Sequence, residues 1–429
     1  MQRAAAAYPA ESVWSLRRAQ DDPIAFLARL ASEGDVVLFS IAGHAACLLN
    51  HPDHVEDVLV TSHATFSKPP AMRRSGALLG RGLLTAEGAW HQQRRKVAQP
   101  VFSPQRLEGY AAVVTAAARR LTDRWRDGTT LDIATSMQGL TMEIIGRLLF
   151  GVDISAHAAD VSRAMTAAAA SLDPLLALLA PARRLAPASR YLRALVDRLI
   201  DDRCASSEAG DDILTLLRRA EGSEGAPPGA QLRDDVATLF VAGHDTIANA
   251  LVWTWHLVGR TPGAEARLHD ELRDVIGERA AGFDDLERLT YTRAVLSEAL
   301  RLYPPAWVLT RQARADHRLG GVTIAEGTVI VVSQYLLHRD RRFFADPLEF
   351  RPERWLADSQ ASRPRLAYFP FGAGPRSCIG QGLAMVEGPL ILATLAARWR
   401  CRPLGPIDAD PRATLRPRGP VPARVERHA

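Results

Sequence analysis

The chain has 429 residues, of which 47% are hydrophobic and 24% charged, and its formal net charge is +5. This composition is ordinary for a globular protein and excludes a disordered chain, because ample apolar surface is available to offset the entropy of ordering. A net charge this small on so long a chain also argues against a nucleic-acid partner.

The chain has no run of 18 or more uncharged apolar residues, and its first residues are too weakly apolar for a secretory signal. We therefore expect no transmembrane anchor and a cytoplasmic location. The wide, irregular spacing of the cysteines, without a C-x-x-C pair, argues against a disulfide framework and against structural zinc. The four cysteines are Cys47, Cys204, Cys378 and Cys401.

The N-terminal half predicts a short mixed region followed by helices. Residues 35–50 are rich in strand-forming residues around a glycine turn, which predicts two strands, and a helix then opens at Pro52–Asp53. The Gly- and Pro-rich stretch 221–230 predicts a loop. Helical periodicity marks the segments 104–126, 132–150, 190–203 and 211–220.

The C-terminal half begins with a long helix over about 231–259, which Pro262 ends. From Val236 onward this helix is apolar on nearly every side, which predicts a central, buried position. Helices near 263–276 and 285–302, strands within 322–333 and a last helix over about 380–398 follow. The predicted fold class is mainly α with a small β region. We expect residues 1–34 to form an N-terminal extension and first helix, and 35–429 a single domain.

The segment FGAGPRSCIG, from Phe371 to Gly380, carries the most specific chemistry. Arg376 and the start of a helix should bias the Cys378 thiol toward the thiolate. Glycines such as Gly374 and Gly380 permit close approach of the backbone to a flat object, and the N–H groups after the cysteine can tune its sulfur. A thiolate ligand of haem iron requires these properties. The alternative is an inert buried cysteine beside a glycine-rich loop.

Two other segments pair residues that suit a buried site. Glu298 and Arg301 stand at i,i+3 on one helix face, where they are either a buried pair or a surface pair of little energy. The long helix contains Ala242-Gly-His-Asp-Thr246. A glycine there costs helix stability and can leave room for a small ligand, while the Thr246 hydroxyl can open the helix locally. The alternative is a kink beside a solvated Asp245.

The spacing F-x-x-G-x-R-x-C-x-G resembles the haem-binding signature of the cytochrome P450 family. The other motifs follow in that family's order, and the resemblance covers about residues 35–400. It implies the mostly helical cytochrome P450 fold, a haem b cofactor (iron protoporphyrin IX) with Cys378 as its metal ligand, and insertion of one oxygen atom from O2 into a substrate. It implies proton delivery by Asp245 and Thr246 beside Gly243, and a structural network of Glu298, Arg301 and Arg354.

Trp90 and Arg94 resemble a W-x-x-x-R motif whose side chains bind a haem propionate, and both can donate hydrogen bonds to carboxylates. The resemblance assigns the remaining cofactor contacts to Arg311, Phe371, Arg376 and Gly380. It also places a set of mostly apolar residues around the substrate, which predicts a lipophilic molecule such as a terpenoid, fatty acyl chain or polyketide. These residues are Leu83, Leu84, Leu239, Ala242, Val308 and Leu309.

No reductase is expected within the chain, so NAD(P)H-derived electrons should come through a separate ferredoxin or flavodoxin and its reductase, acting on a monomer. Arg94-Arg-Lys96 is either a solvated face or part of a basic surface for that donor. Two other functions remain open. One is a peroxide-dependent or rearranging haem-thiolate enzyme, which would not need Asp245 and Thr246. The other is a non-catalytic haem-binding sensor, for which no output module is visible.

Overall fold

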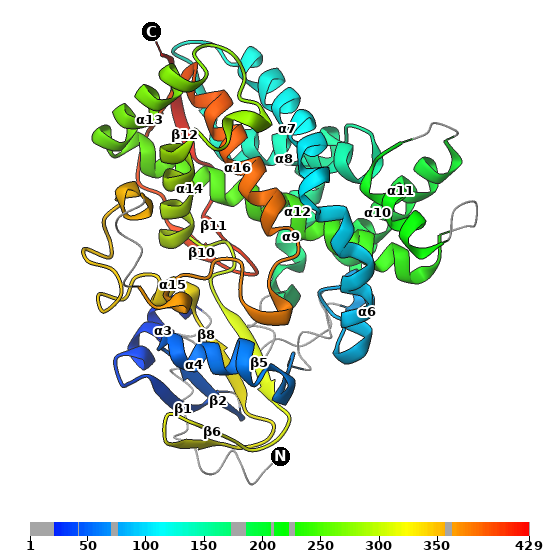
Figure 1. Ribbon diagram of the computed structural model, residues 1–429, viewed down its shortest axis with the longest axis vertical. Helices are drawn as coiled ribbons and strands as arrows, with labels where there is room; N and C mark the ends of the chain where they lie inside the picture. The colour runs from blue at the N-terminus through cyan, green and yellow to red at the C-terminus, as the bar shows by residue number, and fades with distance from the viewer. Residues whose placement is uncertain are drawn as a thin grey trace.

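The computed structural model describes residues 21–41, 43–69, 76–172, 186–206, 210–222, 228–356 and 363–428. Long helices fill most of the molecule, and several strands gather at one end together with α3 and α4 (Figure 1). The helices are α3 (Pro23–Ala31), α4 (Pro52–Glu56), α5 (Gly76–Leu79), α6 (Gly88–Ala98), α7 (Pro104–Arg124), α8 (Ile133–Phe150), α9 (Ala158–Leu172), α10 (Ala186–Ala205), α11 (Ile213–Glu221), α12 (Ala230–Gly259), α13 (Pro262–Val275), α14 (Thr290–Leu302), α15 (Gln334–Leu337) and α16 (Gln381–Ala396). The strands are β1 (Val36–Ile41), β2 (His44–Leu49), β3 (Phe66–Ser67), β4 (Thr130–Asp132), β5 (Leu309–Ala313), β6 (His317–Leu319), β7 (Val322–Ile324), β8 (Val329–Val332), β9 (Trp399–Pro403), β10 (Ala409–Pro411), β11 (Leu415–Pro417) and β12 (Pro422–Arg427).

The largest sheet has five strands in the order β1-β2-β8-β5-β3. The predicted hairpin of residues 35–50 is present as the antiparallel pair β1–β2, joined through Gly43 at a φ of 76°. In β8 the successive residues Val331 and Val332 belong to different apolar clusters, one on each face of the sheet. Because both faces are buried, the strand is continuously apolar and does not alternate with polar residues.

Helix α12 runs through the middle of the molecule and packs against α8, α10, α14 and α16. Its burial explains why the sequence is apolar all round, as predicted. By length and composition α12 could cross a membrane, but 78% of its apolar window is buried inside the protein. The core of the protein therefore accounts for its hydrophobicity. Pro262 opens the next helix, α13, as N1 residue.

Other predicted boundaries agree with the structure to within a few residues, where the structure describes them. The exception is the helix expected over 285–302, which starts at Thr290 because residues Phe283–Asp285 form a separate short turn. Residues 1–20 of the N-terminal extension and 223–227 of the predicted loop 221–230 lie outside the described residues. Near the C-terminus, α16 packs against α7, and β9 joins β12 and β4 in a three-stranded sheet. The hairpin β10–β11 contacts α12. The fold is mainly α with a small β region, as the sequence predicts.

Candidate functional site

The loop 371–380, here called the cysteine loop, precedes α16. The Cys378 N–H donates to the carbonyl oxygen of Phe371 at 2.8 Å, which closes the loop. Gly374 has a φ of +67°, and a Cβ at this position would collide with the carbonyl oxygen of Leu59, so the turn requires glycine. At Gly380 a Cβ would make only ordinary contacts, the nearest at 3.9 Å from the Cys378 sulfur. Packing within the protein therefore does not explain why residue 380 is a glycine.

The Cys378 side chain is accessible, yet its surroundings are dense enough that burial raises the pKa of its thiol. Both observations hold if the sulfur faces a space inside the molecule and not its outer surface. The Gly380 N–H and then Arg95 act in the opposite direction, and neither outweighs burial. The expectation that the helix start and Arg376 bias the unliganded thiol toward thiolate is therefore wrong. A metal cation would have to displace the thiol proton.

Four basic side chains lie close enough to the cysteine loop to influence one another. Burial, and then the charge of Arg376, lowers the pKa of Lys68 to about 7 and that of His91 to about 3. Burial, and again the charge of Arg376, lowers the pKa of Arg311 to about 10. Glu87 offsets part of this charge, since its Oε1 lies 3.0 Å from Nη2 of Arg376.

His91 is neutral at pH 7, but Lys68, Arg311 and Arg376 carry more positive charge than the carboxylates around them offset, because Arg376–Glu87 is the one ion pair that involves any of the three within the described part of the chain. Buried cations are stable only with anionic partners. The cluster therefore fits a bound group that carries carboxylates, and Cys378 offers sulfur to a metal. The Nε1 of Trp90 is also buried without a hydrogen-bond partner among the described residues. The haem that the resemblance implies, with its iron and two propionates, fits this donor set.

Arg94 does not belong to this cluster of basic side chains, because its own partners are carboxylates of α11 and α12. Its Nε donates to Oδ2 of Asp235 at 2.7 Å, and its Nη2 also pairs with Glu221. The expectation that Arg94 binds a cofactor carboxylate is therefore not supported by its contacts. One residue later, Arg95 Nη1 donates to the carbonyl oxygen of Ser377 at 2.7 Å.

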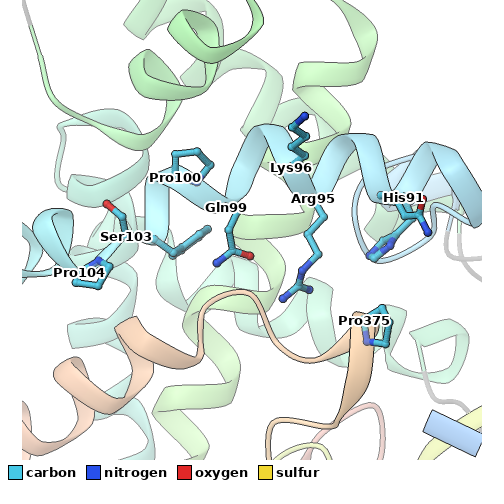
Figure 2. A pocket seen from close by; sticks show the side chains of 10 residues that line it. His91, Arg95, Lys96, Gln99, Pro100, Ser103, Pro104 and Pro375 are labelled. Atoms are coloured by element: carbon cyan, nitrogen blue, oxygen red, sulfur yellow. The ribbon is translucent and has the colours of Figure 1, made fainter. Parts of the chain in front are cut away.

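Helical geometry explains this difference. Residues four apart share a helix face, so His91 and Arg95 both face the cysteine loop, whereas Arg94 is turned toward α11 and α12. Figure 2 shows Arg95 extending from α6 toward the loop that carries Pro375. The sequence contained this signal as H-x-x-x-R, one residue after the W-x-x-x-R spacing.

An open groove of about 660 Å³ lies between α6 and the cysteine loop (Figure 2). Both basic and apolar side chains line it, and the basic ones come from α6. Its lining residues are His91, Gln92, Arg95, Lys96, Gln99, Pro100, Phe102, Ser103, Pro104 and Pro375.

On α12, Thr246 Oγ1 donates to the carbonyl oxygen of Ala242 at 2.9 Å, and the helix continues unbroken. The expected local opening by Thr246 is thus absent from this structure. A Cβ at Gly243 would lie 2.6 Å from Cδ1 of Ile145 on α8. Close packing of α8 on α12 therefore explains this glycine, in place of the expected room for a small ligand.

Asp245 accepts a hydrogen bond at 2.6 Å from the hydroxyl of Thr414, which precedes β11. No motif in the sequence indicated Thr414, because it lies 169 residues away along the chain. Tertiary structure alone brings the two side chains together.

The six residues expected around a substrate divide into two groups. Ala242 and Leu84 are exposed, Leu84 to 38%, and Leu309 is partly buried. The other three are buried in the apolar core: Leu83, Leu239 and Val308. Val308 packs with the sheet and α3, so its contacts do not support a place in a substrate wall.

Glu298 and Arg301 of α14 are brought together with Arg354 of the short turn Pro352–Trp355. Arg301 donates from Nε and Nη2 to the two carboxylate oxygens of Glu298, both at 2.8 Å, and both side chains are fully buried. Arg354 Nε donates to Glu298 Oε1 at 3.1 Å. The sequence did not indicate that the Trp355 indole also donates to Glu298, at 2.9 Å.

The remaining donors of Arg301 bind the backbone. They reach the carbonyl oxygens of His338, Pro347 and Glu349 at 2.7 to 3.0 Å. The side chain therefore fixes the path of the chain between β8 and the cysteine loop, and every charge in the group has a partner.

Comparison with known proteins gives a consistent result. The family model for Cytochrome P450 matches residues 11–419. Cyclooctatin synthase from Streptomyces melanosporofaciens is 38% identical over 92% of this chain and 88% of its own length. Cyclooctat-9-en-7-ol 5-monooxygenase from the same organism is 38% identical over 89% of this chain and 86% of its own. Pentalenene oxygenase from Streptomyces avermitilis is 32% identical over 94% of this chain and 90% of its own length.

The fold is similar to a solved structure, CYP175A1 from Thermus thermophillus. The TM-score is 0.78 at 29% sequence identity, and the likeness covers 97% of this chain and 100% of that one.

Proposed function

Because the chain belongs to the cytochrome P450 family and is a haem-containing monooxygenase of that family, we propose that its substrate is a lipophilic terpenoid, which it hydroxylates or epoxidises. The similarity to cyclooctatin synthase, cyclooctat-9-en-7-ol 5-monooxygenase and pentalenene oxygenase supports this substrate class. The exposed apolar side chains of Leu84 and Ala242 suit such a molecule, since hydrocarbon surface gains free energy by leaving water.

The observation that carries the cofactor assignment is an accessible cysteine sulfur beside buried and half-buried cations that lack enough carboxylates. Cys378 would bind the iron as thiolate, and His91, Arg311 and Arg376 would hold the propionates, with Arg95, which bonds Ser377 of the cysteine loop, taking the part expected of Arg94. When bound, the haem supplies the two-electron activation of O2 that inserts one oxygen atom into substrate. The protein's part is to bind the group, orient substrate and control water and protons.

Asp245 and Thr246 deliver protons to the dioxygen that is being reduced. A carboxylate and a hydroxyl on adjacent residues of α12 can relay protons by turning their side chains. Their partners support this role: Thr246 bonds only its own helix at Ala242, and Asp245 bonds a neutral hydroxyl, so neither is fixed by a salt bridge among the described residues.

Electrons come from a separate ferredoxin or flavodoxin, which docks over the groove between α6 and the cysteine loop (Figure 2). Lys96 and Arg95 give this face positive charge, which attracts an acidic donor and orients it. The protein works in the cytoplasm, where a reducing environment suits the free cysteines Cys47, Cys204, Cys378 and Cys401.

A binding screen followed by turnover tests the substrate class. The purified haem protein is titrated with pentalenene, cyclooctat-9-en-7-ol, a long-chain fatty acid and a macrolactone, and the spin-state change of the haem is read by absorbance. We expect the two terpenoids to produce the change at the lowest concentrations, and to yield a product one oxygen heavier with a surrogate ferredoxin, its reductase and NADPH. Response to the fatty acid or macrolactone alone would refute a terpenoid substrate.

A further inference from the structure

The hairpin β10–β11 is bonded to one face of α12 at three positions one turn apart. Thr414 Oγ1 donates to Asp245 Oδ2 at 2.6 Å, and Asn249 Nδ2 donates to the same hydroxyl oxygen at 3.4 Å. Next, Trp253 Nε1 donates to the carbonyl oxygen of Leu415 at 3.1 Å. The residues 245, 249 and 253 follow the i,i+4 spacing, so they share one face of the helix.

The hairpin is rigidly placed where it meets this face. The Leu415 N–H donates to the Pro305 carbonyl at 2.9 Å, and the Trp307 indole donates to the Arg412 carbonyl at 2.7 Å. Trp253 is fully buried and stacks on Tyr303 with ring centroids 3.9 Å apart. The Thr414 hydroxyl is therefore presented to α12 by a scaffold that does not depend on Asp245 itself.

The bonding pattern fixes the direction of each hydrogen bond. The Asn249 amide can only donate through Nδ2, so it uses a lone pair of the Thr414 oxygen and leaves the hydroxyl hydrogen for Asp245. Among the described residues, no other side chain donates to the Asp245 carboxylate. One hydroxyl thus sets the position of this carboxylate through a short, charge-assisted hydrogen bond. Because the donor is a hydroxyl and not a fixed cation, its hydrogen can rotate away and return during a proton relay.

We propose that Thr414 is a positioning residue for the oxygen chemistry: it holds Asp245 in the orientation from which the carboxylate delivers protons and recovers them. This inference rests on the proposed proton role of Asp245. Thr414 acts through Asp245 and is not itself assigned contact with oxygen or substrate.

The test uses the haem-containing full chain with a surrogate [2Fe–2S] ferredoxin, its reductase and NADPH, and no added substrate. Under these conditions O2 leaves either as H2O2, which takes two electrons and two protons, or as two water molecules, which take four of each. NADPH supplies the electrons, and the buffer supplies the protons. Weaker proton delivery therefore raises the fraction of O2 recovered as peroxide.

Three variants separate positioning from structure. Thr414→Val removes the hydroxyl at nearly constant shape, and Thr414→Ser keeps it. Trp253→Phe breaks the neighbouring bond of the hairpin to α12 but leaves Asp245 its partner. Isotope-edited infrared spectra, with Asp245→Asn as the subtracted reference, report the carboxylate stretch of Asp245 independently of turnover.

We expect Thr414→Val to raise the ratio of peroxide to water about tenfold, as loss of one charge-assisted hydrogen bond predicts, and to shift the Asp245 band. Thr414→Ser should leave the peroxide-to-water ratio and the Asp245 band near their wild-type values. Trp253→Phe should lower the melting temperature without changing the ratio or the band. Unchanged peroxide in Thr414→Val, or the same increase in Trp253→Phe, would overturn the inference. If Asp245→Asn itself leaves the ratio unchanged, the proton role in the proposed function fails. If Asp245→Asn changes the ratio and Thr414→Val does not, only the role of Thr414 fails.

Discussion

Arg94 and Asp235 form an ion pair that closes the space between α6 and α12. The Arg94 Nε–H donates to Asp235 Oδ2 at 2.7 Å, and the two side chains are only 7% and 2% exposed. The second oxygen of Asp235 accepts from the backbone N–H of Leu83 at 3.1 Å. The pair therefore holds the segment that carries Leu83 against the central helix, and Arg94 has a structural explanation that needs no cofactor.

Arg94→Gln should destabilise the fold without reducing haem content in the molecules that remain folded. Removing one partner leaves the buried Asp235 charge unpaired, which costs about 3–5 kcal/mol of unfolding free energy. Arg106→Gln serves as control, because its pair with Asp211 is 40% and 77% exposed and should contribute under about 1 kcal/mol. Denaturant unfolding and the ratio of haem to protein measure the two effects. Loss of haem from Arg94→Gln protein of unchanged stability would show that Arg94 binds the cofactor after all.

Arg311→Gln should have opposite effects on the haem-free and haem-containing protein. Burial and the charge of Arg376 lower the pKa of Arg311 to about 10. The charged guanidinium therefore lowers the stability of the haem-free protein, and a bound anion such as a propionate would remove this destabilisation. The variant should melt at the same or a higher temperature than the wild type when haem is absent, because a costly charge is gone.

With haem present, the same variant should release the cofactor to excess apomyoglobin about tenfold faster, as loss of a charge-assisted hydrogen bond of about 1.5 kcal/mol implies. Arg314→Gln, just after β5 and outside the cluster, is the matched control. A normal release rate in Arg311→Gln would show that this guanidinium does not hold a propionate.

Arg301→Ala should yield little haem-containing protein. It removes two bonds to buried Glu298 and the anchors of three backbone carbonyls, so the expected loss is about 3–5 kcal/mol or more. Arg267→Ala is the control, since its pair with Glu353 is 52% and 41% exposed. Soluble yield, haem content and melting temperature are compared. Normal values for Arg301→Ala would show that the network is dispensable.

Glu387→Gln should change how stability depends on pH. Burial raises the pKa of Glu387 from 4.5 to about 8. Between these values only the unfolded chain loses the proton, so the folded state binds more protons and its stability falls as pH rises, by at most about 1.4 kcal/mol per pH unit. The variant lacks this titration. Its melting temperature should exceed that of the wild type by a margin that grows from pH 5 to pH 8. An equal margin at all pH values would contradict a buried, neutral Glu387.

Local chemistry made most of the fold predictable. Gly43 in the hairpin, Pro262 after α12 and the all-round apolar character of α12 each act on neighbouring residues, and the structure agrees at all three. The cysteine loop was found in the same way, because its glycines, arginine and cysteine are close in sequence.

The partners of the site residues were harder to predict, because they depend on tertiary contacts. Gly243 faces Ile145 from another helix, and Asp245 meets Thr414 from a distant hairpin. On α6, the face toward the cysteine loop carries His91 and Arg95, whereas the W-x-x-x-R motif pointed to Trp90 and Arg94. One residue along a helix is a rotation of about a hundred degrees, so Arg95 and not Arg94 faces the loop. The raised pKa of Cys378 likewise reflects burial that no local motif encodes.

The central claim is that Cys378 binds haem iron through a thiolate. The most direct measurement is the visible spectrum of the purified haem protein after reduction with dithionite and addition of carbon monoxide. The account predicts a strongly red-shifted Soret band, and its disappearance in well-folded Cys378→Ser protein that still contains haem. A folded, haem-loaded wild-type protein without that band, or the same band in Cys378→Ser, would contradict the account.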